Sequence, residues 1–358
     1  MPRMRASLSR ARPLPCVALA LAVAGAPPSQ APALRGLDPV ALCRGHEVAG
    51  DDAWTASHEG LRYRFGDAAS RDTFVADPAR WAIQLGGACA RMGPLSGLGD
   101  PDRWLVHDGR IYVFASESCR EGFASDPSAH LDLDEPRPAP DTSHERARAQ
   151  LLAAVRARPS TWRTLRYRTA RQQGEATSTR VVEMQSPSSV RVDTEYRDGD
   201  RTWRYAHAVS PAGGFVFSAG EAREMAGAAR AGVLRALCRE PAVALANLGH
   251  GVVTARGRAS VGGVAVFEYE VWLDGAVTVF GVDADGRVRT ARFRGRGPDL
   301  RFRELVQVFD DFAVVGGTEV PRARRVLVDG DEVASLTEQR LDVEVDFEPA
   351  PQRFEAPK

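Results

Sequence analysis

The residues most able to do chemistry are four cysteines and two histidines. Cys43, Cys89 and Cys119 lie in the first third of the chain, and Cys238 lies alone further along it. No two of them form a Cys-x-x-Cys pair, the spacing that structural zinc sites usually show. A disulfide between two of the first three cysteines and a set of unbridged thiols are both consistent with this spacing.

A metal site would have to combine these thiols with imidazoles. A thiolate with one or two imidazoles suits a soft or borderline metal ion such as Cu(I) or zinc. Each histidine lies just before a glycine turn, a position that is usually on the surface, and neither has a second ligand two or four residues further on. A structural disulfide or inert thiols are therefore the alternative to a metal ion. The candidate metal ligands are Cys89, Cys119, His58 and His107.

The motifs of common enzyme classes are missing from the sequence. It contains no Gly-x-Ser-x-Gly elbow, no phosphate-binding loop and no dinucleotide-binding glycine pattern. His144-Glu145 does not begin a metalloprotease motif, because position 148 is an arginine. We therefore expect a binding protein and not an enzyme.

An internal repeat organises the first region. Residues 58–65 align with residues 107–114 at a constant offset of 49 residues, and Phe74 aligns with Phe123. Each unit predicts a turn at a glycine, a short strand with Tyr-x-Phe, and a short helix that turns its phenylalanine inward and ends near Asp-Pro, because the residue before proline resists helical geometry. We expect the two units to bury their aromatic side chains against each other.

A proline-rich linker over residues 134–143 follows this region and is expected to be stiff and extended. Thr142 or Ser143 can then cap a helix that runs to about Arg156. From Trp162 onward the dominant hydrophobic period is two, which is typical of strands with one buried face.

Four Asp-Gly pairs separate the alternating runs and predict hairpin turns. Residues 219–248 interrupt the strands with a helical composition. We expect one large curved antiparallel sheet whose concave face is covered by helices from this insertion. The Asp-Gly pairs are Asp198-Gly199, Asp274-Gly275, Asp285-Gly286 and Asp329-Gly330.

Residues 37–133 resemble the YHS domain of exported bacterial proteins. The matching segments are Asp38-Pro39-Val40-Ala41, His58-x-Gly60-x-x-Tyr63-x-Phe65, Gly86-Gly87-x-Cys89-Ala90 and Gly99-Asp100-Pro101-x-x-Trp104. Metal-handling members of that family carry Phe-Cys-x-x-x-Cys near the helix start. Of the four equivalent positions here only Cys119 is a cysteine, since Gly66, Ser70 and Ala115 occupy the others. The resemblance implies a small α+β domain with two internal repeats, and metal binding does not simply carry over.

Residues 144–358 are similar to periplasmic carriers of the outer-membrane lipoprotein-sorting type. The resemblance implies a curved antiparallel half-barrel with helices over its hollow face. It is more specific for the fold than for the cargo, because the matching segments consist largely of strand and turn residues. These segments are Pro187-x-x-Val190-Arg191-Val192-Asp193, Val282-Asp283-x-Asp285-Gly286-Arg287-Val288, Phe309-x-Asp311-Phe312-x-x-Val315-x-Gly317 and Val343-Glu344-Val345-Asp346. The predicted fold class is therefore α+β for the chain as a whole.

A hollow half-barrel could hold a lipid, an acyl chain or a lipoprotein-like apolar ligand, because burial of each methylene contributes about 0.8 kcal/mol. The alternative is that the same side chains pack against the helices as a closed core. A second interpretation places a metal-binding or redox-sensing function in the first domain, with the half-barrel as a scaffold. Only this second interpretation requires a metal ion, and no other cofactor is expected. The predicted apolar lining consists of Phe215, Phe217, Phe267, Tyr269, Val271 and Phe293.

Residues 1–31 are predicted to be a signal peptide, with arginines before a short apolar run and small residues before cleavage after Ala26 or Ala31. The run is shorter than the roughly twenty residues that span a bilayer, so we expect an exported, periplasmic protein with no transmembrane segment in the mature chain. The full chain has 47 basic and 47 acidic residues, and loss of the signal arginines leaves it slightly acidic. This balance argues against nucleic acid as a partner, and we expect an apolar small molecule or lipid, with envelope proteins as a further class.

Overall fold

The computed structural model describes residues 31–95, 98–132, 135–155, 162–173, 176–185, 188–218, 221–225, 227–334, 336–350 and 352–355. The predicted signal peptide lies outside these ranges except for Ala31. None of the helices in the described ranges combines the length and apolarity that a membrane crossing requires.

The N-terminal region, residues 31–132, consists of two copies of one unit, as the repeat predicts. Each copy is a two-stranded antiparallel hairpin followed by a helix and a short helical turn. The first copy contains β1 (Asp51–His58), β2 (Leu61–Phe65), α2 (Ala68–Ala76) and α3 (Pro78–Trp81), and the second contains β3 (Asp100–His107), β4 (Arg110–Phe114), α4 (Glu117–Ala124) and η3 (Pro127–His130). The remaining helical segments are η1 (Leu34–Gly36), α1 (Pro39–Cys43) and η2 (Gln84–Gly87).

The two copies match in their backbone and in their aromatic contacts. The residues before the two hairpin glycines, Glu59 and Asp108, both have a φ of 48°. The ring of Phe74 lies 4.9 Å from that of Tyr63, and the ring of Phe123 lies 5.3 Å from that of Tyr112. The inward placement of both phenylalanines is therefore confirmed.

The aromatic side chains form two clusters and not the single one expected. Successive residues of β4 point to opposite sides, so Ile111 and Val113 pack in the cluster of Phe74 while Tyr112 and Phe114 pack in the cluster of Phe123. Strand β4 is thus the shared wall between the two units. A backbone hydrogen bond of 3.2 Å from Ile83 to the Tyr63 hydroxyl adds a further link within the first cluster.

The C-terminal region, residues 135–355, contains two antiparallel sheets, which corrects the expectation of one. The first has the order β10-β9-β8-β7-β6-β5-β19, and the second runs from β11 to β17 in sequence order with β18 paired to β16. The helices of the predicted insertion lie between β10 and β11, so these strands end their own sheets and do not pair. The helical prediction for residues 219–248 is wrong at residues 221–224, which pair with β9 as strand β10.

The first sheet contains β5 (Thr164–Gln173), β6 (Ala176–Gln185), β7 (Ser189–Asp198), β8 (Arg201–Ser210), β9 (Gly213–Ser218), β10 (Glu221–Glu224) and β19 (Leu341–Val345). The second contains β11 (Val252–Val261), β12 (Val264–Leu273), β13 (Ala276–Val282), β14 (Val288–Arg296), β15 (Phe302–Val315), β16 (Thr318–Val328), β17 (Asp331–Glu332) and β18 (Glu338–Gln339). Asp-Gly pairs occur at the predicted turns, and Asp274 and Gly275 both have positive φ, 49° and 77°, as a tight hairpin turn requires.

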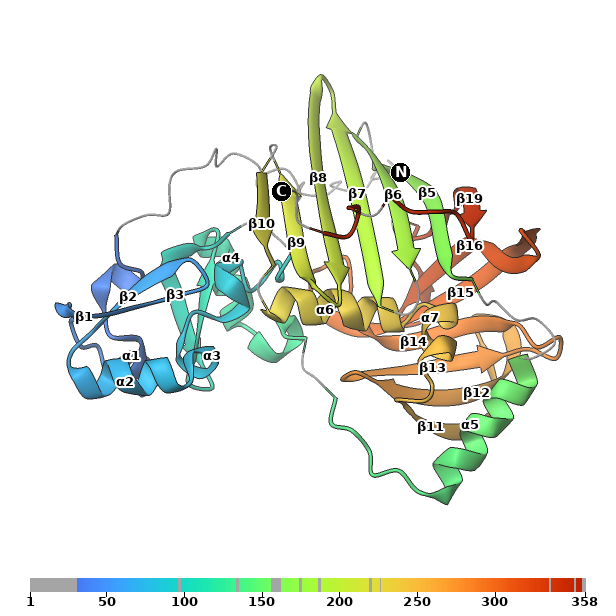
Figure 1. Ribbon diagram of the computed structural model, residues 1–358, viewed down its shortest axis with the longest axis horizontal. Helices are drawn as coiled ribbons and strands as arrows, with labels where there is room; N and C mark the ends of the chain where they lie inside the picture. The colour runs from blue at the N-terminus through green and yellow to red at the C-terminus, as the bar shows by residue number, and fades with distance from the viewer. Residues whose placement is uncertain are drawn as a thin grey trace, which may run out of the picture.

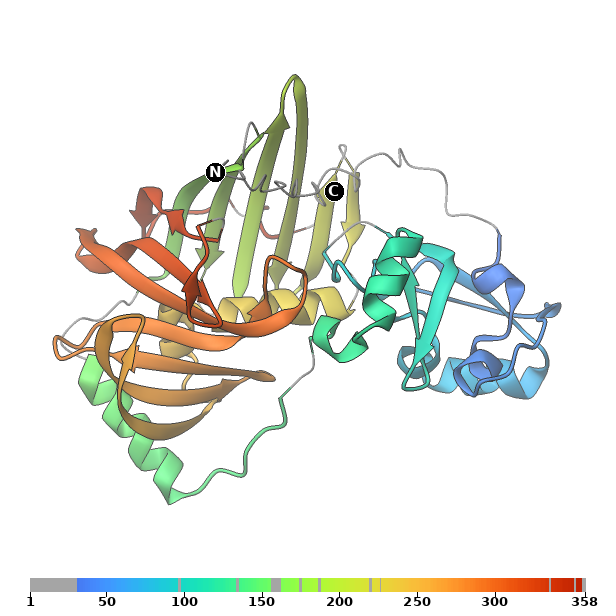
Figure 2. The ribbon, with the colours of Figure 1, turned by 180° about the vertical axis from the view of Figure 1, so that it is seen from behind.

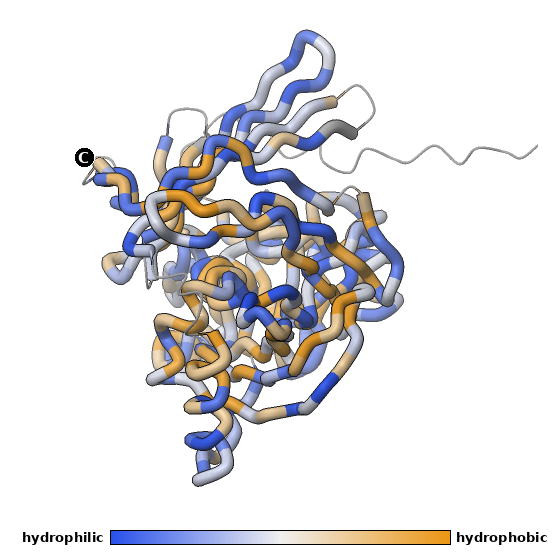
Figure 3. The backbone as a smooth tube through the Cα atoms, turned by 90° about the vertical axis from the view of Figure 1, so that its right-hand side faces the viewer, coloured by the Kyte–Doolittle hydropathy of each residue, from blue (hydrophilic) through white to orange (hydrophobic). Residues whose placement is uncertain are grey.

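Three helices cover the apolar faces of these sheets. Helix α5 (Thr142–Val155) packs on the second sheet. Its cap is Asp141 and not the predicted Thr142 or Ser143, because the Asp141 carboxylate accepts hydrogen bonds from the backbone N–H groups of Ser143 and His144 at 2.8 and 3.1 Å. Helices α6 (Gly227–Cys238) and α7 (Pro241–Ala246) lie between the two sheets, which is visible from both sides in Figures 1 and 2. We call these two helices the helix layer. Figure 3 shows that apolar segments concentrate in the body of the molecule and that its projecting upper hairpin is hydrophilic.

The N-terminal region contacts the second sheet and α6 through polar groups. Asp132 accepts two hydrogen bonds from Arg235 of α6, of 3.0 and 3.1 Å. The His130 imidazole lies 3.1 Å from the Leu300 carbonyl oxygen. Arg296 of β14 donates to the carbonyl oxygens of Arg91 and His130. These contacts place the N-terminal region beside one end of the helix layer.

The matched phenylalanines give a direct test of the repeat. Phe74 and Phe123 are both almost fully buried, at 1% and 0% exposure. We expect Phe74→Ala and Phe123→Ala each to lower the free energy of unfolding by about 3 to 5 kcal/mol. Val75→Ala, at a side chain 60% exposed on the same helix as Phe74, should change it by less than about 0.5 kcal/mol. Denaturant unfolding followed by tryptophan fluorescence measures all three, and equal effects of Val75→Ala and Phe74→Ala would contradict the assigned packing.

Candidate functional site

The helix layer is shared by the cores of both sheets. Val233 and Leu237 of α6 pack with Leu165 and Val209 of the first sheet. Cys238 of α6 and Ala244 of α7 pack instead with the cluster of the second sheet, while Val243 of α7 packs with that of the first. A ligand that entered between the sheets would therefore have to contact this layer.

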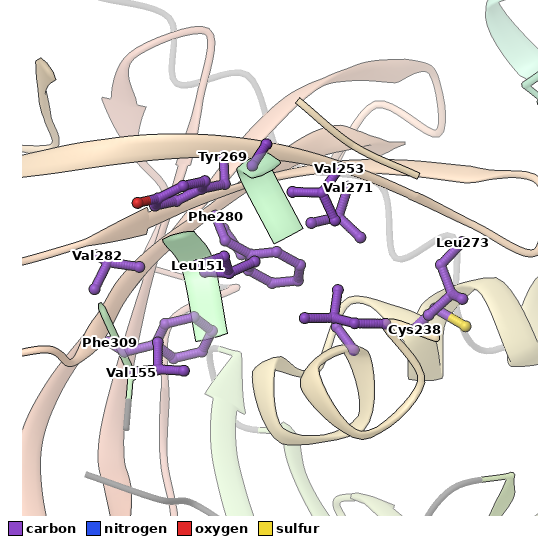
Figure 4. Packing of buried hydrophobic residues seen from close by; sticks show 14 residues of the cluster. Leu151, Val155, Cys238, Val253, Tyr269, Val271, Leu273, Phe280, Val282 and Phe309 are labelled. Carbon is purple, nitrogen blue, oxygen red and sulfur yellow. The ribbon is translucent and has the colours of Figure 1, made fainter. Parts of the chain in front are cut away.

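Most of the predicted lining on the second sheet is packed. Tyr269 and Val271 are 5% and 1% exposed. Figure 4 shows them gathered with Phe280 of the same sheet and with Leu151 and Val155 of α5. Phe267 lies further along β12, with 36% of its surface exposed and its ring 5.0 Å from that of Tyr269. The closed-core alternative describes this part of the sheet.

Phe215 and Phe217 lie on the other face of the first sheet from the helix layer. They pair across strands with Ala208 and Ala206, whereas the intervening Val216 packs in the cluster with α6. The helix side of β9 has little room, because a Cβ on Gly214 would lie 3.2 Å from Met225. The structure therefore does not bring these two phenylalanines together with the rest of the predicted lining.

Two cavities border Glu240, where α6 meets α7. The first has a volume of about 40 Å³, the space of about one water molecule or slightly more. Its wall is mainly apolar and includes an ion pair of 2.8 Å between Arg287 and Glu319. Its apolar lining consists of Val155, Trp162, Pro241, Ala242, Leu245, Val288, Phe312, Val320 and Pro321.

The second cavity is larger, at about 240 Å³, and lies between the end of α6 and strands β14 to β16. Phe293 is the one predicted lining residue that borders it, and the Arg239 guanidinium lies 4.5 Å from its ring centroid. The complete lining consists of Ala236, Arg239, Glu240, Phe293, Gly295, Arg296, Leu305, Gln307 and Arg324. Sequence reasoning missed the charged members of this wall, because arginines are spread over the whole chain and carry no distinguishing spacing.

A network of buried charges lies behind both cavities. Arg340, whose side chain is 1% exposed, donates to Glu240 at 2.9 Å. Glu338 accepts a hydrogen bond from Arg171 at 3.1 Å and forms an ion pair with Arg324 at 2.8 Å. Burial alone would raise the pKa of Glu338, but the nearby arginines 324, 340 and 171 hold that pKa below its usual value. The Glu338 carboxylate is therefore ionised, and both Glu240 and Glu338 are already engaged by arginines.

The four predicted metal ligands do not form one site. His58 and His107 contact Phe74 and Phe123 edge to face, with ring centroids 6.4 and 6.3 Å apart. Elsewhere, the Cys89 and Cys119 side chains interact with each other, and burial raises the pKa of Cys89. The four cysteines among the described residues are all free thiols.

No group of three or more potential metal ligands gathers anywhere in the part of the chain that the structure describes. The other two thiols are also held protonated, because burial raises the pKa of Cys43 to about 11 and that of Cys238 to about 12. The repeat explains the two histidines by their equivalent packing on phenylalanine.

Comparisons with known proteins find partial similarity of architecture. No family model matches the sequence, and no curated protein matches it. A DUF1329 family protein from Desulfovibrio piger aligns with a TM-score of 0.39 at 12% identity, covering 60% of this chain and 98% of its own. A putative outer membrane lipoprotein-sorting protein domain from Vibrio parahaemolyticus aligns with a TM-score of 0.39 at 12% identity, covering 59% and 97%. For a LolA superfamily protein from Nitrosomonas europaea, the values are 0.37, 14%, 57% and 95%.

These structures are similar to this chain over about 60% of its length, and they assign it neither a ligand nor a residue role. These comparisons do not test the resemblance of residues 37–133 to the YHS domain, which stays a prediction.

The pKa of His207 tests whether water is excluded from the face of the first sheet that the helix layer covers. It pairs with Val216 on the helix side of the sheet, and burial, together with Arg180, lowers its pKa from 6.5 to about 4. The unfolded chain therefore takes up a proton between about pH 6.5 and 4 that the folded chain does not. We expect the free energy of unfolding to decrease by about 2 to 3 kcal/mol through His207 as the pH is lowered across this window.

The measurement is the free energy of unfolding at several pH values for the protein and for His207→Gln. The variant should lose part of the pH slope between pH 6.5 and 4, because glutamine does not titrate. Identical slopes would show that the imidazole is hydrated in the folded protein.

Proposed function

We propose that this chain is an exported, periplasmic binding protein without catalytic activity, which holds a lipid or another apolar ligand at the helix layer. The observation that carries the proposal is the pair of cavities that border Glu240, one with a mainly apolar wall and one with Phe293 and Leu305 in its wall. Both lie where the helices cover the apolar faces of the sheets, so an apolar ligand would displace contacts of the same kind.

The volumes indicate that an acyl chain would enter by moving the helix layer. A space of about 40 Å³ cannot hold a chain of methylenes. Helix α7 has only six residues and is separated from α6 by two residues, Arg239 and Glu240, so it is a small element to displace. Burial of ten methylenes would contribute about 8 kcal/mol, which can offset the loss of its contacts.

The proposal is tested with the mature protein purified from an exporting host. Native mass spectrometry should find a bound species that is lost on denaturation. After delipidation, the protein should bind the neutral apolar probe N-phenyl-1-naphthylamine. Neither a bound species nor probe binding would contradict the proposal and favour a module that binds other proteins.

Leu245 provides the site-specific variant, since it is a partly buried residue of α7 that lines the apolar cavity. We expect Leu245→Gln to weaken probe binding by about tenfold, because an amide replaces an apolar wall. Leu152→Gln is the matched control, at a side chain 37% exposed on α5 that does not line the cavity. Equal losses in both variants would show that the probe binds elsewhere.

A further inference from the structure

The second cavity carries more positive charge than its surroundings neutralise. Three arginines and one glutamate line it, which is an excess of two positive charges: Arg239, Arg296 and Arg324 against Glu240. Burial of charge without a counterion is costly, so buried charges in proteins are normally paired. An excess of two positive charges in this cavity therefore requires a counterion nearby.

The carboxylates nearest the cavity are already engaged by other arginines. Glu240 is held by Arg340, and the partner of Arg324 is Glu338, which also binds Arg171. Asp132, which lies close enough to influence Arg239 and Arg296, accepts both of its hydrogen bonds from Arg235. Among the described residues, the guanidinium groups of Arg239 and Arg296 are thus left without a carboxylate in direct contact.

Arg239 and Arg296 have only carbonyl oxygens as acceptors among the described residues. Arg239 donates to the Arg294 carbonyl oxygen at 3.1 Å. Arg296 donates to three carbonyl oxygens, which fix its side chain at the junction with the N-terminal region. The ring faces of Phe293 and Phe302 lie 4.5 and 4.8 Å from the two groups and offset part of their charge.

The groups around the cavity also match an anion in shape and polarity. Arginine presents a planar set of donors that suits the oxygens of phosphate and carboxylate, and Gln307 adds an amide to the same wall. A volume of about 240 Å³ equals about eight water molecules in the liquid, which accommodates a phosphate with a few further atoms but not an acyl chain. The apolar side of the wall, Phe293 and Leu305, is where an aliphatic continuation would lie.

We propose that this cavity is the site of a phosphate ester head group, held by Arg239 and Arg296 with Gln307. The inference rests on the proposed function in taking the phosphate to belong to an amphiphile whose tail contacts the helix layer. The exposed Ala236 marks the open side of the cavity, from which free phosphate could also enter. The site itself requires only the phosphate, so a lipid source and a free source are separable by experiment.

The experiment measures the binding of three probes to the mature full chain by calorimetry. The two lipid probes are used below the concentrations at which they aggregate. Lauroyl lysophosphatidic acid and monolauroylglycerol share the tail and the glycerol, and they differ by the phosphate. Inorganic phosphate is the third probe. We expect the phosphate-bearing lipid to bind at least about tenfold more tightly than the neutral one, and inorganic phosphate to compete with it weakly.

Two variants and one control assign this preference to the cavity. Arg239→Gln removes one positive charge, and Gln307→Glu adds a negative charge to the same wall. Each should reduce the preference for the phosphate-bearing lipid to about twofold or less, while the affinity for monolauroylglycerol changes little. Arg258→Gln removes the same charge from an exposed position on β11 outside the cavity and should keep the full preference.

Folding of the variants is checked by thermal unfolding. Gln307→Glu should unfold at an equal or higher temperature than the parent protein, because it supplies a counterion to the cavity. It therefore keeps the test decisive if Arg239→Gln does not fold. A loss of preference in a variant of undiminished stability would support the site directly.

The other outcomes separate the two proposals. Equal binding of both lipids, unchanged by either variant, would overturn the phosphate site and leave lipid binding standing. Binding of inorganic phosphate alone, lost in Arg239→Gln, would support the site and contradict the lipid carrier. Binding of none of the three probes would overturn both.

Discussion

A buried ion pair between Glu240 and Arg340 fixes the bend between α6 and α7, and the arrangement of the two sheets depends on it. Arg340 lies directly before β19, an edge strand of the first sheet, and its guanidinium lies 4.5 Å from the ring centroid of Tyr167 in β5. Glu338 extends the network by binding both Arg171 of the first sheet and Arg324 of the second. Removal of one partner of such a pair leaves an uncompensated buried charge and costs about 3 to 5 kcal/mol. The charges therefore hold together elements that are far apart in the sequence.

This network also explains why the two cavities lie where they do. Charged side chains that must be paired keep apolar side chains from closing over the junction, and Glu240 borders both cavities as a result. On one side the wall is mainly apolar, and on the other side Arg239 and Arg296 remain without a carboxylate partner among the described residues. A ligand with an apolar part and an anionic part fits this division better than a purely apolar one.

The sequence predicts local features well and long-range ones poorly. The 49-residue repeat, the hairpin turns and the inward phenylalanines depend on neighbours in the chain, and each is found as expected. The separation of β10 from β11 and the return of β19 to β5 depend on contacts between residues far apart in the sequence. Phe215 and Val216 point to opposite faces as in any strand, but which face the helices cover also depends on long-range packing. The arginines of the second cavity gave no signal, because Lys358 is the only lysine and arginine serves every other cationic position.

The central claim is that the helix layer and the adjoining strands β14 to β16 bind the ligand. Hydrogen exchange of the mature full chain, with and without lauroyl lysophosphatidic acid, tests it most directly because every part of the chain is observed at once. The account predicts that exchange changes in α6, α7 and β14 to β16. A change confined to residues 31–132, or no change under conditions in which the lipid is bound, would contradict it.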